Sequence, residues 1–156
     1  MSFNVVIPAR LNSSRLGEKV LIEINGIPML IHVAQRASLS GAKNVVIATD
    51  DEKIAEVVRY YNFKSVMTNK NHLSGTDRCL EASEIKKWDG QDIIVNVQAD
   101  EPLIDPALID LLAKNIIDDQ SEYVTACSEF KSYKEFVNPN NVKVILDNFS
   151  NALYFS

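Results

Sequence analysis

The chain has 156 residues, of which 46% are hydrophobic and 24% are charged, and these proportions indicate an ordinary globular domain, not a disordered or fibrous chain. The formal net charge is −5, and no cluster of lysines and arginines indicates binding to nucleic acid. No apolar run approaches the roughly 20 residues of a membrane helix. The two cysteines do not have the spacing of a zinc site or a disulfide framework. We therefore expect one cytoplasmic domain over residues 1–156 that does not insert into a membrane.

Short apolar runs rich in β-branched residues alternate with segments of helical periodicity up to about residue 120. This alternation is typical of an α/β domain with a mostly parallel sheet. Pro8 should end the first strand, because proline cannot donate a hydrogen bond to a neighbouring strand. The four strands that we expect are Asn4–Ile7, Asn44–Ala48, Ser65–Met67 and Asp92–Gln98.

Proline and short polar residues mark where the helices begin. A turn at Asn25-Gly26 precedes Pro28, whose missing N–H costs nothing at the first position of a helix that runs to about Ser40. Three further helices should follow the second, third and fourth strands. Their expected N-cap residues are Asp50 or Asp51, Ser74 or Thr76, and Asp105 followed by Pro106.

The pattern changes in the last part of the chain. Tyr123–Cys127 has the composition of a strand, and Ser132 with Glu135 forms a capping-box pattern for a short helix. Val142–Leu146 and Ala152–Phe155 then indicate a hairpin around a polar turn.

The loop after the first strand, residues 8–19, carries the clearest chemical signal. Its sequence P-A-R-L-N-S-S-R-L-G-E-K matches neither the dinucleotide-binding nor the P-loop pattern. It places Arg10, Arg15 and Lys19 on one loop, where guanidinium and ammonium groups could bind a polyphosphate. The alternative is that these are three solvated surface cations.

The loops after the third and fourth strands should meet the first loop, because ligands of open α/β sheets bind beyond the carboxyl ends of the strands. Asp100 ends the fourth strand, where it could bind Mg²⁺ together with phosphate oxygens or merely cap a turn. Gly75 would let the backbone approach a flat base. His72 could act as a general base or form a structural hydrogen bond.

Taken together, these loops resemble the 3-deoxy-manno-octulosonate cytidylyltransferases, the enzymes that make CMP-Kdo for lipopolysaccharide. The likeness runs in order from the first strand to the last residue. The segments that carry it are I-P-A-R-L-N-S-S-R-L-G-E-K (7–19), I-N-G-I-P-M-L-I-H-V (24–33), V-V-I-A-T-D-D (45–51), H-L-S-G-T-D-R (72–78), I-V-N-V-Q-A-D-E-P (94–102), N-P-N-N-V-K-V (138–144) and A-L-Y-F-S (152–156).

The resemblance implies a Rossmann-like nucleotidyltransferase fold and a Mg²⁺-dependent transfer of CMP from CTP to the sugar acid Kdo, with release of pyrophosphate. It implies that Arg10, Arg15 and Lys19 bind the triphosphate and that Asp100 is the metal ligand, these four being the catalytic residues. The cytidine would lie against the remaining predicted residues, which are Ala9, Ser74, Gly75, Arg78, Gln98 and Ala99. In the full-length family it implies a homodimer.

Three departures from the family pattern stand out. Gly17-Glu18 replaces a usual Pro-Gly, and Ala99 replaces a common glycine. Relatives continue beyond Ser156, so the resemblance implies a chain truncated before the acceptor-binding part and a second metal-binding aspartate, one that alone makes little CMP-Kdo. Two alternatives stay open: a cytidylyltransferase for another sugar acid of the sialic-acid type, and a non-catalytic CTP-binding fragment.

Overall fold

The structure is a computed structural model that describes residues 2–11 and 18–156. The chain divides into two compact units, Met1–Val124 and Thr125–Ser156, and the single functional domain expected from the sequence stays a prediction. No helix in the described part of the chain is both long and apolar enough to cross a membrane.

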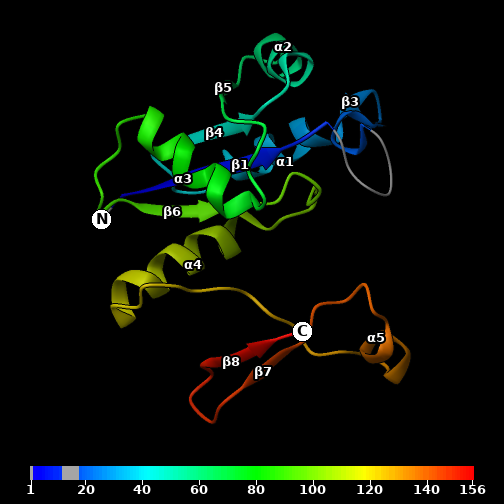
Figure 1. The fold of residues 1–156 in the computed structure, drawn as a ribbon, viewed down its shortest axis with the longest axis vertical. Coiled ribbons are helices and arrows are strands. Elements are labelled where there is room, and N and C mark those ends of the chain that lie inside the picture. The colour runs from blue at the N-terminus through cyan, green and yellow to red at the C-terminus, as the bar shows by residue number, and fades with distance from the viewer. Residues whose placement is uncertain (1, 12–17) are drawn as a thin grey trace. The chain divides into compact units, whose positions relative to one another are not determined.

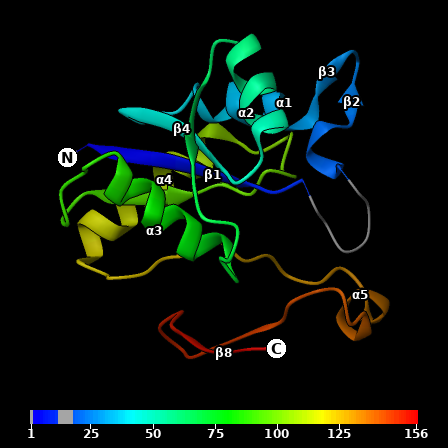
Figure 2. The same ribbon diagram turned by 45° about the horizontal axis from the view of Figure 1, so that its top comes forward.

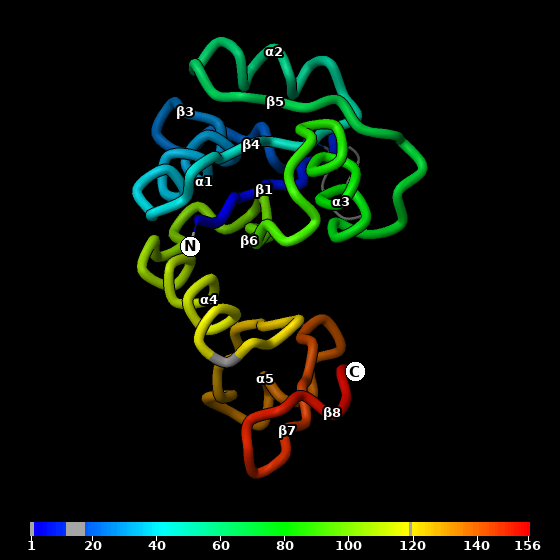
Figure 3. The backbone as a smooth tube through the Cα atoms, turned by 90° about the vertical axis from the view of Figure 1, so that its left-hand side faces the viewer, coloured from blue at the N-terminus to red at the C-terminus, as the bar shows by residue number. Residues whose placement is uncertain are grey.

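The first unit is built on a four-stranded parallel sheet with the strand order β5-β4-β1-β6 (Figure 1). Figure 3 shows this order from top to bottom. The strands are β1 (Phe3–Ala9), β4 (Asn44–Thr49), β5 (Lys64–Met67) and β6 (Ile93–Asn96). The predicted α/β class with a parallel sheet is therefore confirmed.

Proline does not end β1, contrary to the prediction. The strand continues through Pro8 to Ala9 and pairs with β4 along its whole length from Asn4. The carbonyl of Val6 accepts a hydrogen bond from the amide of Val97 at 3.0 Å, so the backbone of Val6 faces β6. Pro8 faces the same side two residues further on, beyond the last register pair with β6. Its missing N–H therefore interrupts no ladder.

A small antiparallel hairpin follows the first loop. After a short 3-10 helix, η1 (Lys19–Leu21), the strands β2 (Glu23–Ile24) and β3 (Ile27–Pro28) pair across a two-residue turn. Asn25 and Gly26 both have positive φ, 52° and 76°, which is the backbone that such a turn requires. The predicted turn is confirmed, and the two short strands are additional.

Four helices cover the sheet of the first unit: α1 (Met29–Ala37), α2 (Glu52–Tyr60), α3 (Gly75–Ile85) and α4 (Pro106–Asp119). Pro28 is the N-cap of α1 and not its first residue, and α1 ends at Ala37, earlier than expected. The other caps are among those predicted, because the side chains of Asp51, Ser74 and Asp105 each accept a backbone N–H of the helix that follows.

The helices lie on both faces of the sheet (Figure 1, Figure 2). Alternate residues of β1 such as Val5 and Ile7 pack in one cluster with buried residues of α1, α2 and α4. Val6 packs on the opposite face in a second cluster that includes Cys79 and Ala82 of α3. α3 therefore covers one face, and its first turn lies at the carboxyl edge of the strands.

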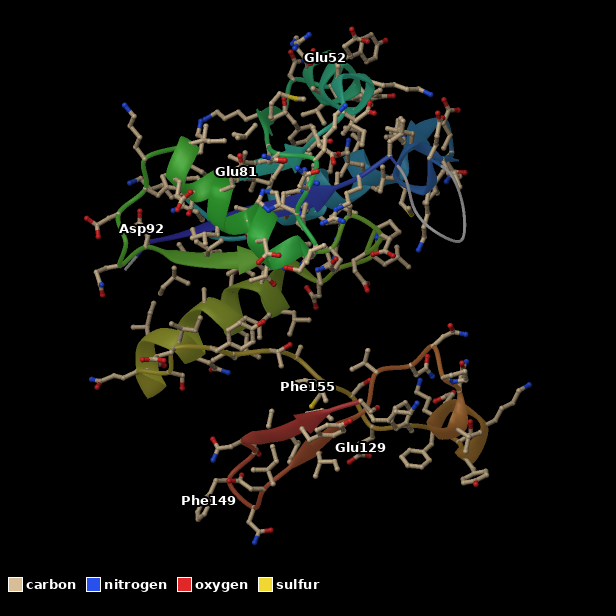
Figure 4. The ribbon with its side chains drawn as sticks, viewed as in Figure 1. Glu52, Glu81, Asp92, Glu129, Phe149 and Phe155 are labelled. Atoms are coloured by element: carbon tan, nitrogen blue, oxygen red, sulfur yellow. The ribbon has the colours of Figure 1, made fainter. Side chains whose placement is uncertain are left out.

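The second unit contains the short helix α5 (Tyr133–Val137) and the antiparallel pair β7 (Val144–Leu146) and β8 (Ala152–Phe155) (Figure 2). The predicted cap at Ser132 and the predicted hairpin are confirmed. Figure 4 shows Phe149 at the tip of this hairpin. The strand expected over residues 123–127 is wrong, because this segment forms no ladder with any described strand.

Candidate functional site

A cavity of about 220 Å³ opens at the carboxyl edge of the sheet. β4 lies on one side of β1 and β6 on the other, so the chain reverses its direction across the sheet at this point. Ligands of open α/β sheets bind at such switch points. The residues that line the cavity are Pro8, Arg10, Lys19, Val20, Gly75, Gln98, Ala99 and Asp100.

The cavity brings together the three loops that the sequence analysis singled out, those after β1, β5 and β6. Arg15, the third predicted phosphate-binding cation, lies outside the described residues. Pro8 and Val20 also line the cavity and were not predicted, because an apolar wall residue carries no chemical signal in a sequence.

Lys19 and Asp100 form an ion pair inside this cavity. Lys19 begins η1 and Asp100 follows β6, and the Lys19 Nζ lies 2.7 Å from the Asp100 Oδ2. Their side chains are 43% and 44% exposed, and an ion pair in such a setting contributes only about 0–1 kcal/mol to stability. Both groups can therefore exchange partners with an incoming anion or cation at small cost.

Glu18, the unusual acidic residue beside Lys19, is held away from the cavity lining. Its carboxylate accepts from the Lys53 Nζ with both oxygens, each at 2.7 Å, and Lys53 belongs to α2. The Glu18 backbone is left-handed, with φ 56°, and its N–H donates to the Leu11 carbonyl at 3.0 Å. The negative charge that departs from the family pattern is thus paired with a cation on α2.

The first turn of α3 forms one wall of the cavity. The Arg10 Nη2 donates to the carbonyl of Ser74 at 3.2 Å, and Ser74 is the N-cap in a capping box with Asp77. Hydrogen bonds from the side chain and backbone of Ser74 hold the pKa of Asp77 below its usual value. A Cβ on Gly75 would lie 3.2 Å from the Pro8 Cγ. Glycine at this position therefore allows α3 to start close against the end of β1.

The end of β6 forms the opposite wall. The Gln98 Nε2 donates to the Asn96 Oδ1 at 3.3 Å, and both residues are exposed. Ala99 is buried in the core cluster beneath the cavity, and so is Ala9 at the end of β1. Of the two, only Ala99 lines the cavity, where it offers backbone and a small apolar surface; Ala9 and Ser74 are not among the lining residues.

Arg78 is expected from the resemblance to lie against the cytidine, and this contact stays a prediction. Arg78 is completely buried and does not line the cavity. Its Nη2 donates to the Asp50 Oδ2 at 2.9 Å, and its Nη1 donates to the Thr68 hydroxyl. Its guanidinium is therefore held at the ends of β4 and β5.

His72 and the cysteines do not form catalytic sets in the described part of the chain. The His72 Nε2 is hydrogen-bonded to Glu81 of α3, so His72 forms a structural hydrogen bond. This bond, with a second from the Asn69 amide, holds the pKa of Glu81 below its usual value of 4.5. Burial raises the pKa of Cys79 to about 12, so its thiol stays protonated at neutral pH.

The described residues contain no group of three or more His, Cys, Asp or Glu side chains able to hold a metal ion. A lone carboxylate at the cavity suits Mg²⁺ nonetheless, because this ion binds one or two carboxylates together with phosphate oxygens and water. Asp100 meets that requirement only when a phosphate is bound beside it.

A larger hollow of about 840 Å³ lies within the second unit. Its lining includes Cys127, Phe130 and Phe155, and Glu129 is the single charged residue among the lining residues. A nucleotide triphosphate needs cations, and this hollow offers none. The smaller cavity in the first unit is therefore the candidate functional site.

Comparison with known proteins agrees with this fold. A family model described as cytidylyltransferase matches residues 4–156, so the chain belongs to the cytidylyltransferase family. It is similar to the 3-deoxy-manno-octulosonate cytidylyltransferase of Methylibium petroleiphilum, with 47% identity over 100% of this chain and 60% of the relative. For the enzyme of the same name from Neisseria meningitidis serogroup C, the identity is 47% over 99% of this chain and 61% of the relative.

Solved structures give the same result. The structure of a CMP:2-keto-3-deoxy-manno-octonic acid synthetase complexed with CTP matches with a TM-score of 0.85 and 36% identity, over 100% of this chain and 64% of that one. A cytidylyltransferase from Leptospira borgpetersenii matches with a TM-score of 0.66 and 28% identity, over 77% of this chain and 50% of that one. The resemblance and the Rossmann-like nucleotidyltransferase fold are confirmed. The chain spans about 60% of the length of the curated relatives it matches.

Proposed function

We propose that this chain binds CTP in the cavity at the β1–β6 edge and supplies the nucleotide half of a CMP-Kdo-forming cytidylyltransferase. The observation that carries the proposal is the meeting of Arg10, Lys19 and Asp100 with the glycine-led start of α3 in one cavity at the switch point of the sheet. The similarity to a synthetase structure complexed with CTP supports it.

In the proposed reaction, the anomeric hydroxyl of Kdo attacks the α-phosphorus of CTP. A new bond forms from this oxygen to phosphorus, the bond to the bridging oxygen breaks, the hydroxyl proton is lost, and pyrophosphate leaves. Such transfers depend chiefly on positioning and on stabilising negative charge. Arg10 and Lys19 would neutralise charge on the triphosphate, together with Arg15.

Asp100 would hold Mg²⁺ beside the phosphates, where the ion adds positive charge. Lys19 is already held next to this carboxylate, so the cationic and anionic partners of a metal–triphosphate complex are both in place before ligand binding. Gly75, Gln98 and Ala99 would contact the cytidine, with the backbone of Ala9 and Ser74 close behind them.

The proposed function also includes an acceptor, an assembly and a cellular compartment. Kdo is the expected acceptor, a homodimer the expected assembly, and the cytoplasm the expected compartment. Pyrophosphate release, measured with CTP, Mg²⁺ and each of a panel of sugar acids, identifies the acceptor. Release with Kdo and with no other sugar acid supports the proposal. Release with a sialic acid and not with Kdo would make the sialic acid the substrate. CTP binding without turnover for any acceptor supports a CTP-binding chain that is not catalytic by itself.

Calorimetric titration of the chain with CTP, UTP, ATP and GTP tests the nucleotide site directly. We expect CTP to bind most tightly, and Arg10→Ala to weaken it by about 10- to 150-fold, since a hydrogen bond to a charged group contributes about 1.5–3 kcal/mol.

Arg59→Ala is the matched control, because Arg59 is an exposed arginine of α2 whose partner is Glu52 at 3.4 Å. Its affinity for CTP should equal that of the unsubstituted chain. Equal CTP affinities of Arg10→Ala and Arg59→Ala would show that the phosphates of CTP do not bind in this cavity.

A further inference from the structure

Arg78 is a fully buried arginine that the proposed reaction does not use. It lies in the first turn of α3, and its relative exposure is 0%. Its Nη2 binds Asp50, whose side chain is 16% exposed, and its Nη1 binds the Thr68 hydroxyl. The Nε has no hydrogen-bond partner among the described residues. The guanidinium of Arg78 is therefore held by two side-chain partners, Asp50 and Thr68.

The partners of Arg78 belong to two different strand ends. Asp50 follows β4 directly, and Thr68 follows β5. Thr68 is itself tied to β4, because its N–H and its hydroxyl both donate to the carbonyl of Thr49, at 2.8 and 3.1 Å. One side chain of α3 therefore joins the carboxyl ends of β4 and β5 to the helix.

Burying a guanidinium and a carboxylate is costly, and a hydrophobic replacement for such a pair is often as stable or more stable. Stability alone therefore does not account for this arrangement. A buried pair does restrict geometry, since only one placement of the helix lets the planar group reach both partners.

The helix that Arg78 holds carries a wall of the CTP cavity. Ser74, four residues earlier, accepts the Arg10 hydrogen bond through its carbonyl. Gly75 lines the cavity and packs so closely on Pro8 that an added Cβ would lie 3.2 Å from its ring. A small displacement of the start of α3 would therefore move the acceptor that orients the Arg10 guanidinium.

We propose that Arg78 is a positioning residue for nucleotide binding: by joining α3 to the ends of β4 and β5, it fixes the Ser74 carbonyl that orients Arg10 in the cavity. This inference rests on the proposed function, because it assigns to Arg10 a role in binding the triphosphate. Arg78 is not among the residues that line the cavity, and its proposed effect passes through Ser74 and Arg10.

The test is a double-mutant cycle between Asp50→Asn and Arg10→Ala, read as the CTP dissociation constant. Asp50→Asn keeps the size of the partner but removes its charge, so it loosens Arg78 without opening a cavity. We expect it to weaken CTP binding by about 10-fold in the otherwise unchanged chain and by less than about 2-fold in Arg10→Ala, because coupled neighbours are not additive. Equal losses in the two backgrounds would overturn the proposal.

Glu81→Gln is the control, since Glu81 is also on α3 but binds His72 and the Asn69 amide and not Arg78. Its effect on CTP affinity should be small and additive with Arg10→Ala. Strong coupling of Glu81→Gln with Arg10→Ala would show that any disturbance of α3 has the same effect, and it would overturn the specific role of Arg78.

Hydrogen exchange of the backbone amides gives a readout that needs no nucleotide. Asp50→Asn should speed exchange at the amides of residues 77–79 and leave the amides of β1 unchanged. Unchanged exchange at residues 77–79 would overturn the positioning role even if CTP binds normally. Failure of the unsubstituted chain to bind CTP would overturn the proposed function, and this inference with it.

Discussion

Two ion pairs at the carboxyl edge of the same sheet differ in almost every physical respect. Lys19–Asp100 lines the cavity with side chains that are 43% and 44% exposed. Arg78–Asp50 lies in the interior, at 0% and 16%. Water screens the first pair, so its members can take up new partners, whereas the second pair has given up its hydration and cannot. The two pairs therefore differ in how freely they can exchange partners, although each joins a cation to an aspartate.

The largest expected effect is on the buried pair. Arg78→Ala leaves the Asp50 carboxylate without its cation, and removal of one partner of a buried pair typically costs about 3–5 kcal/mol. Urea denaturation should show this loss in the free energy of unfolding. Arg59→Ala, which breaks an exposed pair, should stay within about 0.5 kcal/mol of the unsubstituted chain. Similar free energies of unfolding for the two variants would show that the buried pair contributes no more to stability than the exposed one.

Lys19→Ala should show the opposite profile. Its free energy of unfolding should change by less than about 1 kcal/mol, because the pair with Asp100 is exposed. Its CTP affinity should fall by about 1.5–3 kcal/mol, the contribution of a hydrogen bond to a charged group. Calorimetry and urea denaturation of the same sample measure the two quantities. A large loss of stability with unchanged CTP affinity would make Lys19 a structural residue.

Asp100→Asn sharpens the comparison by removing charge without changing shape. The outer partners of a metal ligand typically contribute about 10- to 100-fold to metal affinity, so losing the ligand itself should cost at least about 10-fold in the Mg²⁺-dependent part of CTP binding. In the presence of a chelator the variant should bind CTP no more weakly than the unsubstituted chain, since it has one negative charge fewer near the phosphates.

Glu101→Gln is the matched control for Asp100→Asn, because it alters the adjacent carboxylate, which does not line the cavity. Its dependence on Mg²⁺ should match that of the unsubstituted chain. If Glu101→Gln and not Asp100→Asn lost that dependence, the metal ligand would be Glu101.

The smallest expected effect concerns Glu81, an acidic residue of α3 outside both ion pairs. The hydrogen bond from His72 holds the pKa of Glu81 below its usual value of 4.5, so the unfolded chain takes up a proton at this site at higher pH than the folded chain. The contribution of Glu81 is therefore complete above pH 4.5 and is lost as the pH falls below that value. Urea midpoints between pH 6 and 3 should fall less steeply for Glu81→Gln than for the unsubstituted chain. An equal dependence of the urea midpoint on pH in the two proteins would contradict the lowered pKa of Glu81.

The sequence predicted those features that depend on neighbouring residues. The Asn25-Gly26 turn and the cap at Ser74 follow from local backbone chemistry, and both are present. The four strands of the parallel sheet were also recognisable, because each contains a short run rich in apolar residues. Tyr123–Cys127 shows the limit of that signal, since a strand needs a partner and the composition of a segment does not provide one.

The sequence could not predict features that depend on distant pairing. Asp50 and Asp51 are equivalent candidates for a helix cap, and only the fold shows that Asp51 caps α2 while Asp50 binds Arg78. The burial of Arg78 is a second example, because nothing in its motif indicates that its side chain lies in the interior. The cations of the first loop were recognisable because their charge has a direct chemical meaning.

The central claim is that CTP binds at the β1–β6 edge of the first unit. An NMR titration with CTP and Mg²⁺, followed through the backbone amides, tests it most directly. The largest chemical-shift changes should lie at Arg10, Gly75, Ala99 and Asp100, while the amides of the second unit around Phe130 and Phe155 stay unchanged. Changes that centre on the hollow of the second unit, or that are absent at saturating CTP, would contradict the claim.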